Sequence, residues 1–293
     1  MSAMRERERL AMATIDEDLD MSVARLTILL LATMLAAPAQ AETVDCVPVT
    51  SLPATISTQG IYCLTGNLST SQTSGNAITI NANNVTLDLN GWKVGGQAAG
   101  TGTYAYGIYS AAANVTVKNG IVRGFLNGVV LTGRGATVQG ITADQNTAVG
   151  IDVEGPGSVV QGNQVVDTGG STIGSNVDAI GISVYGPGSL IHNNLVSGLT
   201  ATGSAGEFGI SFLGAATQST ARHNVVSDTA RPTAGSSGIY VGGSSAVAVS
   251  SNIITNFTYC VDYAGGATGT YSRNTAISCD TPYSGGTAGS GND

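Results

Sequence analysis

The sequence predicts an all-β fold in which short strands stack as a parallel solenoid. Three observations support this: a recurring glycine–apolar pair, two-residue alternation within the strands, and turn-forming residues between them. The pair opens six runs, at Gly107, Gly128, Gly150, Gly181, Gly209 and Gly238, with spacings of 21, 22, 31, 28 and 29 residues. A period of this size is typical of repeat architectures, in which each unit buries its apolar face against the next.

The individual runs have the two-residue period of strands. In Ile151-Asp152-Val153-Glu154 the apolar side chains face one way and the polar ones the other. Turn formers such as Gly155-Pro156-Gly157-Ser158 follow the runs. The alternative architecture, a meandering antiparallel barrel, would not require the same residue type at the same phase of every repeat.

Asparagines recur just ahead of the second apolar strand of each repeat. They are Asn163, Asn194, Asn224, Asn252 and Asn274. In a parallel solenoid, equivalent residues of successive coils lie about 4.8 Å apart. We therefore expect these side chains to form a hydrogen-bonded ladder from coil to coil.

The N-terminal region has the features of an export signal. Arg25 precedes an apolar run from Leu26 to Ala37, and Ala39-Gln40-Ala41 is a small-x-small cleavage site. We expect a polar leader or mis-assigned start at 1–20, a signal peptide at 21–41, an N-terminal cap at 42–74, the parallel solenoid at 75–286 and a flexible tail at 287–293. The protein should be secreted or periplasmic, without a membrane span, because the apolar run is short.

Composition excludes some partners. The net charge of −8 and the lack of a basic stripe argue against nucleic acid as a partner. The four cysteines form two pairs in the sequence, Cys46/Cys63 and Cys260/Cys279. Export favours disulfides, and pairing by proximity is one of three connectivities. No metal-binding cluster is evident, and we expect no metal and no cofactor.

Roughly residues 50–285 resemble the right-handed parallel β-helix superfamily, the pectate-lyase-like fold. The stretches that carry the resemblance are Gly60-Ile61-Tyr62-Cys63-Leu64-Thr65-Gly66-Asn67-Leu68 and the segment from Ile78 to Gly91. The resemblance implies a single right-handed β-helix of about 7–8 rungs with capped ends. Left-handed hexapeptide helices have a shorter period, and the arrays of calcium-binding β-rolls are absent.

Two groups of residues are candidates for chemistry. On the first strand of each repeat, Asp152, Glu154, Ser183 and Tyr185 should lie on neighbouring rungs, where a carboxylate and a tyrosine can move a proton on a sugar. A second column reads Lys118, Gln161, His192, Arg222 and Ser250, with His223 beside it. Arginine can clamp a carboxylate, and histidine titrates near neutral pH. The plain alternatives are a solvated strand face and a polar ladder at a turn.

Loops on one edge are expected to be long in the middle rungs only, where they would wall a groove. Asp178 and Glu207 lie in them. We predict catalytic roles for His192, Arg222, His223, Tyr185 and Asp152, and substrate binding by Lys118, Glu154, Asp178 and Glu207. Arg222 would neutralise a uronate carboxylate, and His192 or Tyr185 would abstract a proton.

The sequence therefore predicts an exported β-helix that binds a polysaccharide or surface glycan and, if it is an enzyme, acts as a polysaccharide lyase or C5-epimerase. The Asp-Pro-His-Asp motif of mannuronan epimerases, the polygalacturonase motifs and the Trp-Ile-Asp-His motif of pectate lyases are all missing. The alternative is a non-catalytic envelope or adhesive module. The sequence leaves the sugar and the oligomeric state open.

Overall fold

A computed structural model describes residues 45–229 and 235–293. The expected leader (1–20) and signal peptide (21–41) lie outside these residues. In the described part, the only helix is the three-residue 3-10 helix η1, Gln97–Ala99. No helix there has the length and apolar character needed to cross a membrane.

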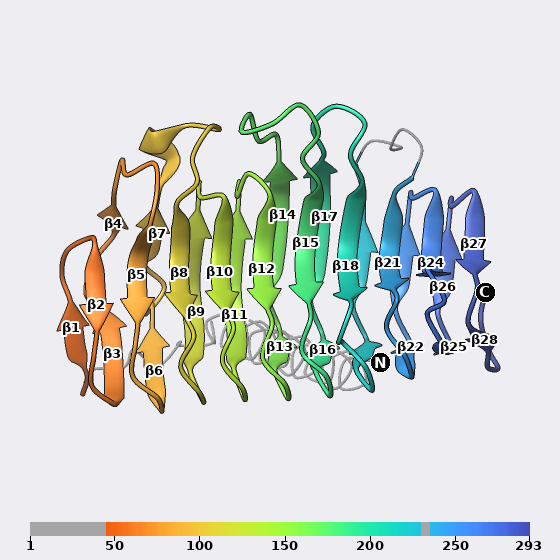
Figure 1. Cartoon of the computed structure of the whole chain (residues 1–293), viewed down its shortest axis with the longest axis horizontal. Coiled ribbons are helices and arrows are strands. Elements are labelled where there is room, and N and C mark those ends of the chain that lie inside the picture. Colours follow the sequence, from red (N-terminus) through yellow and green to blue (C-terminus); the bar gives the residue numbers. More distant parts are fainter. Residues whose placement is uncertain (1–44, 230–234) are drawn as a thin grey trace, which may run out of the picture. The chain divides into compact units, whose positions relative to one another are not determined.

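The strands form two sheets in which every pairing between strands is parallel (Figure 1). The ten-stranded sheet, here sheet B, contains one strand from each coil in chain order. Nine of its strands lie within residues 75–286 and are separated by eight turns, which is compatible with the predicted rung count. Its strands are β2 (Ala54–Ile56), β5 (Asn76–Ile80), β8 (Tyr106–Ser110), β10 (Asn127–Leu131), β12 (Val149–Val153), β15 (Ala179–Val184), β18 (Glu207–Leu213), β21 (Ser237–Gly242), β24 (Tyr259–Ala264) and β27 (Thr281–Ser284).

The eighteen-stranded sheet, here sheet A, supplies the other two sides of each coil. One side begins each coil and consists of β1 (Val47–Val49), β3 (Gly60–Leu64), β6 (Val85–Asp88), β13 (Val159–Gln161), β16 (Leu190–His192), β19 (Thr220–Arg222), β22 (Val247–Ser250), β25 (Gly269–Ser272) and β28 (Thr287–Ala288). The other consists of β4 (Leu68–Ser69), β7 (Lys93–Gly95), β14 (Gln164–Gly169), β17 (Leu195–Thr200), β20 (Val225–Ser227), β23 (Ile253–Thr255) and β26 (Thr275–Ile277). The long strands β9 (Thr116–Arg123) and β11 (Thr137–Asp144) run through both sides.

The core lies inside the coil and is built from stacked aliphatic side chains. The residues after the repeating glycines are direct register neighbours on sheet B: Ile108, Val129, Ile151, Ile182, Ile210 and Ile239. All six are fully buried. The predicted stacking of like residues on one sheet is therefore confirmed.

The repeating glycines are required by close packing. A Cβ atom at Gly181 would lie 2.4 Å from Val196 Cγ1 and 2.6 Å from the carbonyl oxygen of Gly209 on the next coil. Any larger residue would collide with backbone, which explains why the repeat has glycine at this phase.

The predicted asparagine ladder is present and buried. Asn194 donates from Nδ2 to the Oδ1 of Asn224 (2.9 Å) and to the carbonyl oxygen of Val160 (2.9 Å). The same pattern repeats from Asn163 to Asn274. From Asn194 onward, each Oδ1 also accepts the backbone N–H of the asparagine on the preceding coil, while Asn163 Oδ1 accepts the N–H of Ile141. Every coil in this stretch is thus tied to the next by side-chain hydrogen bonds.

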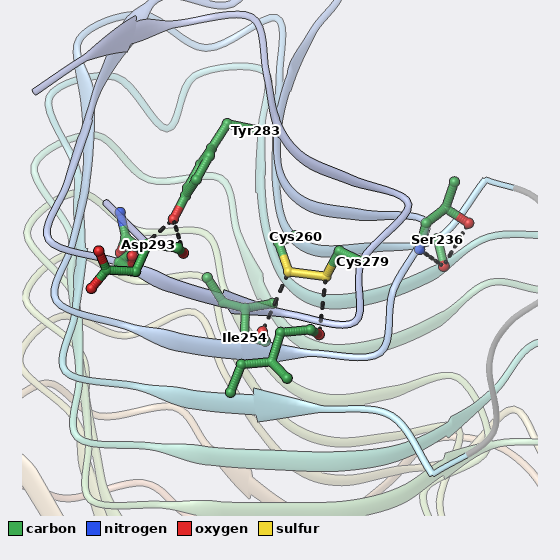
Figure 2. The surroundings of a disulfide bond; sticks show 9 residues. Ser236, Ile254, Cys260, Cys279, Tyr283 and Asp293 are labelled. Carbon is green, nitrogen blue, oxygen red and sulfur yellow. Dashed lines mark hydrogen bonds between the residues drawn. A yellow bond between two sulfur atoms is a disulfide. The ribbon is translucent and has the colours of Figure 1, made fainter. Parts of the chain in front are cut away.

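Both predicted disulfides are present, Cys46–Cys63 and Cys260–Cys279, with Cα separations of 5.8 and 5.7 Å. Figure 2 shows the second one, with Cys260 beside Ile254. It joins β24 to the segment before β27. On the chain-entropy estimate, closing loops of this length contributes about 3 kcal/mol each.

Residues 287–293 are not the flexible tail that the sequence suggests. β28 pairs with β25, and Asn292 Oδ1 accepts hydrogen bonds from the backbone and side chain of Asn274. Asn292 therefore takes the ladder position of a further coil. The tyrosines Tyr271 and Tyr283 stack in the same region, with ring centroids 4.7 Å apart.

The connections that lead into sheet B differ in length from coil to coil. We call this corner the loop edge; it is the upper edge in Figure 1. The connections β9–β10 (124–126) and β11–β12 (145–148) are short, whereas β14–β15 (170–178), β17–β18 (201–206) and β20–β21 (228–236) are longer. The β7–β8 connection (96–105) is also long, so the expectation of long loops in the middle rungs only is wrong.

Candidate functional site

The outward face of sheet B carries a column of small polar side chains that are buried. Asp152, Ser183 and Ser211 are register neighbours on β12, β15 and β18, and we call them the polar column. They are only 8%, 2% and 1% exposed. The predicted alignment of Asp152 with Ser183 is confirmed.

Two atoms of the polar column have no hydrogen-bond partner. They are Asp152 Oδ1 and Ser211 Oγ. Buried polar groups in folded proteins are nearly always paired, so unpaired ones need an explanation. Asp152 and Ser211 lie in one register column, two coils apart.

Asp152 titrates near neutral pH. Burial, and then the nearby charge of Glu154, raise its pKa to about 7, while a hydrogen bond from the Ser183 hydroxyl acts in the opposite direction. Burial and the charges of Asp152 and Glu154 also raise the pKa of Tyr185 on the next coil. These interactions place the three predicted residues Asp152, Glu154 and Tyr185 together. Glu154 and Tyr185 are exposed, the latter by 41%.

Aromatic rings flank the polar column on both sides. Tyr106 and Tyr109 of β8 are stacked at 6.3 Å, and Phe208 of β18 lies 5.0 Å from Tyr240 of β21. Tyr109 and Tyr240 occupy the same register column as Asp152. Flat rings beside hydroxyls and carboxylates can contact both the apolar and the polar faces of a sugar.

His192, Arg222 and His223 form a separate group. His192 pairs in register with Arg222 on sheet A, and burial, Arg222 and His223 lower the pKa of His192. His223 is in the left-handed conformation (φ 54°) at the corner that carries the asparagine ladder. Tyr185 interacts with Asp152 and Glu154 of sheet B, whereas His192 interacts with Arg222 and His223 of sheet A. The five residues predicted to be catalytic thus fall into two groups on different sheets.

The remaining predicted binding residues make contacts within the scaffold. Lys118 forms an ion pair with Asp88, 3.1 Å long, between adjacent coils. Asp178 accepts the N–H of Gly206 (2.8 Å), and Glu207 accepts the N–H of Ala201 (3.0 Å). The two loop carboxylates therefore order the long connections. Their roles in substrate binding stay predictions.

The aromatic flanks and the unpaired Ser211 were not singled out from the sequence as site residues. Aromatic residues make up only 5% of the chain, yet they recur at outward positions of the sheet-B strands, and this recurrence could have identified them. Across the described ranges, no group of three His, Cys, Asp or Glu side chains could hold a metal ion.

Solved structures similar to this fold include two tailspike proteins. The Dettilon tailspike protein aligns with a TM-score of 0.62 and 16% identity over 84% of this chain and 59% of its own. Tailspike protein 2 from an Escherichia coli O157:H7 bacteriophage aligns with a TM-score of 0.51 and 12% identity over 81% of this chain and 37% of its own. The chain thus spans less than two thirds of either protein, and the likeness establishes the fold.

No curated protein sequence matches the chain significantly. A family profile described as "Right handed beta helix region" matches residues 106–277. This segment includes the repeating glycines, the polar column and the asparagine ladder, and it is more than half of the chain. The chain therefore belongs to the right-handed β-helix family and has the pectate-lyase-like fold that its sequence resembles.

Proposed function

We propose that the protein binds a neutral polysaccharide across the outward face of sheet B and hydrolyses its glycosidic bonds with Asp152 and Glu154. The observation that carries this proposal is the buried Asp152 carboxyl, which has an unpaired oxygen and a pKa raised to about 7. A carboxyl that stays protonated near neutral pH beside a second carboxylate is the arrangement that glycoside hydrolysis requires.

The charged residues of sheet B favour a neutral polysaccharide over a uronic acid polymer as the ligand. The ten strands of sheet B contain no Lys, Arg or His, while Asp152, Glu207 and Asp262 lie on them. A polyanion would be repelled by this face. Elimination or epimerisation of a uronate also needs a cation at the sugar carboxylate, and the cationic group around Arg222 belongs to sheet A. We therefore favour hydrolysis over the lyase or epimerase chemistry suggested by the sequence.

In the proposed mechanism, the rings of Tyr109 and Tyr240 pack against sugar units, and the oxygens of the polar column bind sugar hydroxyls. Protonated Asp152 donates its proton to the glycosidic oxygen as the bond to the anomeric carbon breaks. Glu154, two residues further along the same strand direction, accepts a proton from the water that attacks the anomeric carbon. The products are two shorter glycans, and the cycle is completed when Glu154 releases its proton to solvent and Asp152 takes one up from solvent.

The experiment is an incubation of the protein with neutral glucans, mannans and galactans and with alginate and pectate. Reducing ends and the absorbance of unsaturated uronates are measured in parallel. We expect reducing ends from a neutral polymer, and Asp152→Asn and Glu154→Gln should each lower the rate at least 100-fold. Asp262→Asn is the matched control, because Asp262 lies in the same outward column on β24.

Three outcomes distinguish the alternatives. Loss of cleavage in Asp152→Asn with retained cleavage in Asp262→Asn supports hydrolysis. Unsaturated products from alginate or pectate that depend on His192 and Arg222, but not on Asp152, contradict it and support a lyase. Binding to a glycan without any product supports the alternative of an exported, non-catalytic adhesive module. The two disulfides fit a protein that is exported to an oxidising compartment.

A further inference from the structure

A pocket of about 320 Å³ lies at the loop edge, away from the polar column. One wall is the long β7–β8 connection (96–105), and the other is the end of β14 at Asp167 and Gly169, just before the long β14–β15 connection (170–178). Between these walls lie the short connections β9–β10 and β11–β12, which line the pocket with Gly124, Gln145 and Thr147. Its volume is at the lower end of the ~300–1,000 Å³ range that is usual for small-molecule sites.

The two long connections meet above the short ones. The backbone N–H of Thr172 donates to the carbonyl oxygen of Thr101 (3.0 Å), and the two threonine hydroxyls are 3.3 Å apart. Seventy-one residues separate these threonines in the chain. The contact holds the β14–β15 connection against the pocket wall that contains Thr101.

The floor of the pocket is held by backbone hydrogen bonds. Thr147 N–H donates to the carbonyl oxygen of Phe125 (2.6 Å), and Gly169 N–H donates to that of Asn146 (2.8 Å). The side chain of Asn146 is buried and bonds the carbonyl oxygen of Val122 and the N–H of Phe125. A pocket with a fixed floor is preorganised for a ligand.

One polar group on this floor has no partner. Thr147 lines the pocket and is only 5% exposed, yet its Oγ1 makes no hydrogen bond. The walls add the amides of Gln97 and Gln145, which bond each other, and the carboxylate of Asp167. Arg123, next to the pocket, is already paired with Asp144 (2.9 Å) and Gln145 (2.9 Å).

We propose that this pocket is a second binding site, which takes a single neutral sugar unit. Hydroxyl groups both donate and accept, so they match the mixed set of a threonine hydroxyl, two amides and a carboxylate. The negative charge of Asp167 would repel an anionic ligand. Arg123, which would attract one, is already paired with Asp144. The proposal does not rest on hydrolysis at the sheet-B face, because the two sites share no residue.

The test is a saturation-transfer NMR titration of the whole protein with D-glucose, D-galactose, D-mannose and L-rhamnose, with D-glucuronate as the anionic comparison. We expect one or more neutral sugars to bind, and D-glucuronate to bind more weakly. Thr147→Val, which removes only the hydroxyl, should weaken binding about tenfold. Gln97→Ala should do so as well, and since Gln97 is exposed, this variant avoids the risk of misfolding.

Two controls separate this site from others. Thr137→Val makes the same change at the start of β11, outside the pocket, and should leave the dissociation constant unchanged. Asp152→Asn alters the sheet-B face, where the proposed function also places neutral sugars, and so shows how much of the binding signal comes from that face. The proposal is overturned if no neutral sugar binds, if Thr147→Val and Gln97→Ala have no effect, or if D-glucuronate binds more tightly. Loss of all binding in Asp152→Asn would overturn it too, because the sugar would then be on sheet B alone.

Discussion

The molecule contains two columns of buried polar side chains, and they differ in how their hydrogen bonds are satisfied. In the asparagine ladder, each amide bonds the next coil and a backbone carbonyl oxygen. In the polar column of sheet B, Asp152 Oδ1 and Ser211 Oγ have no partner. Both columns follow the same stacking period, so the period alone does not distinguish them. The difference indicates that the paired column stabilises the fold, whereas the two unpaired oxygens of the polar column add no hydrogen bond to it. The polar column belongs to the face on which we propose that a glycan binds.

The largest effect should come from breaking the paired column. Asn224→Ala removes hydrogen bonds to Asn194, Asn252 and Ile191, and leaves their buried groups unsatisfied. We expect the free energy of unfolding to fall by about 4 kcal/mol, measured by urea denaturation. Asn193→Gly is the control: its position is exposed and left-handed (φ 56°), so glycine should change stability by less than about 1 kcal/mol. Equal losses in the two variants would contradict the structural role of the ladder.

The second largest effect should be a pH dependence of the free energy of unfolding that is due to Asp152. Its pKa is raised from 3.8 to about 7 in the folded protein. Between these values the folded state holds a proton that the unfolded state has released, so stability from this group is present at low pH and is lost as pH rises to about 7. Relative to Asp152→Asn, the wild type should lose roughly 4 kcal/mol of its free energy of unfolding between pH 4 and pH 8. Parallel stability curves for the two proteins would show that Asp152 has an ordinary pKa.

The smallest effect is expected at Ser211. Ser211→Ala removes a buried hydroxyl that has no partner, and should leave stability unchanged or raise it by about 1 kcal/mol. Ser211→Ala should also weaken the affinity for a glycan, because a ligand hydroxyl would lose its hydrogen-bond partner. Thermal unfolding and glycan titration of one variant therefore give opposite signs. A clear loss of stability would mean that the hydroxyl already has a structural partner.

Much of the fold could be predicted from the sequence, because stacking imposes the same residue at the same phase. Gly181 must be glycine where coils approach closely, and the isoleucine after it must fill the core. The alignment of the asparagines followed from the repeat, and the structure has the disulfide pairing by proximity, one of the three connectivities that the sequence allows. The order of residues 287–293 could not be predicted, because it depends on Asn292 bonding to a residue of the preceding coil.

The candidate site was predictable only in part. Asp152, Glu154 and Tyr185 come together because Asp152 and Glu154 lie at the end of β12 and Tyr185 follows β15, the adjacent strand. His192 is close to Tyr185 in sequence, but the chain turns a corner between them, which puts the two residues on different sheets. The burial of Asp152 and the contact between Thr101 and Thr172 depend on coils that are distant in sequence, so no local pattern predicts them.

The uneven loop edge has a consequence for how such a protein can change. Two sides of each coil and the asparagine corner are constrained by stacking, so an insertion there would disturb the neighbouring coils. At the loop edge, connections of three residues and of ten residues coexist within one stack. New ligand specificities can therefore arise by altering this one corner, coil by coil, while the scaffold that supports it is inherited intact.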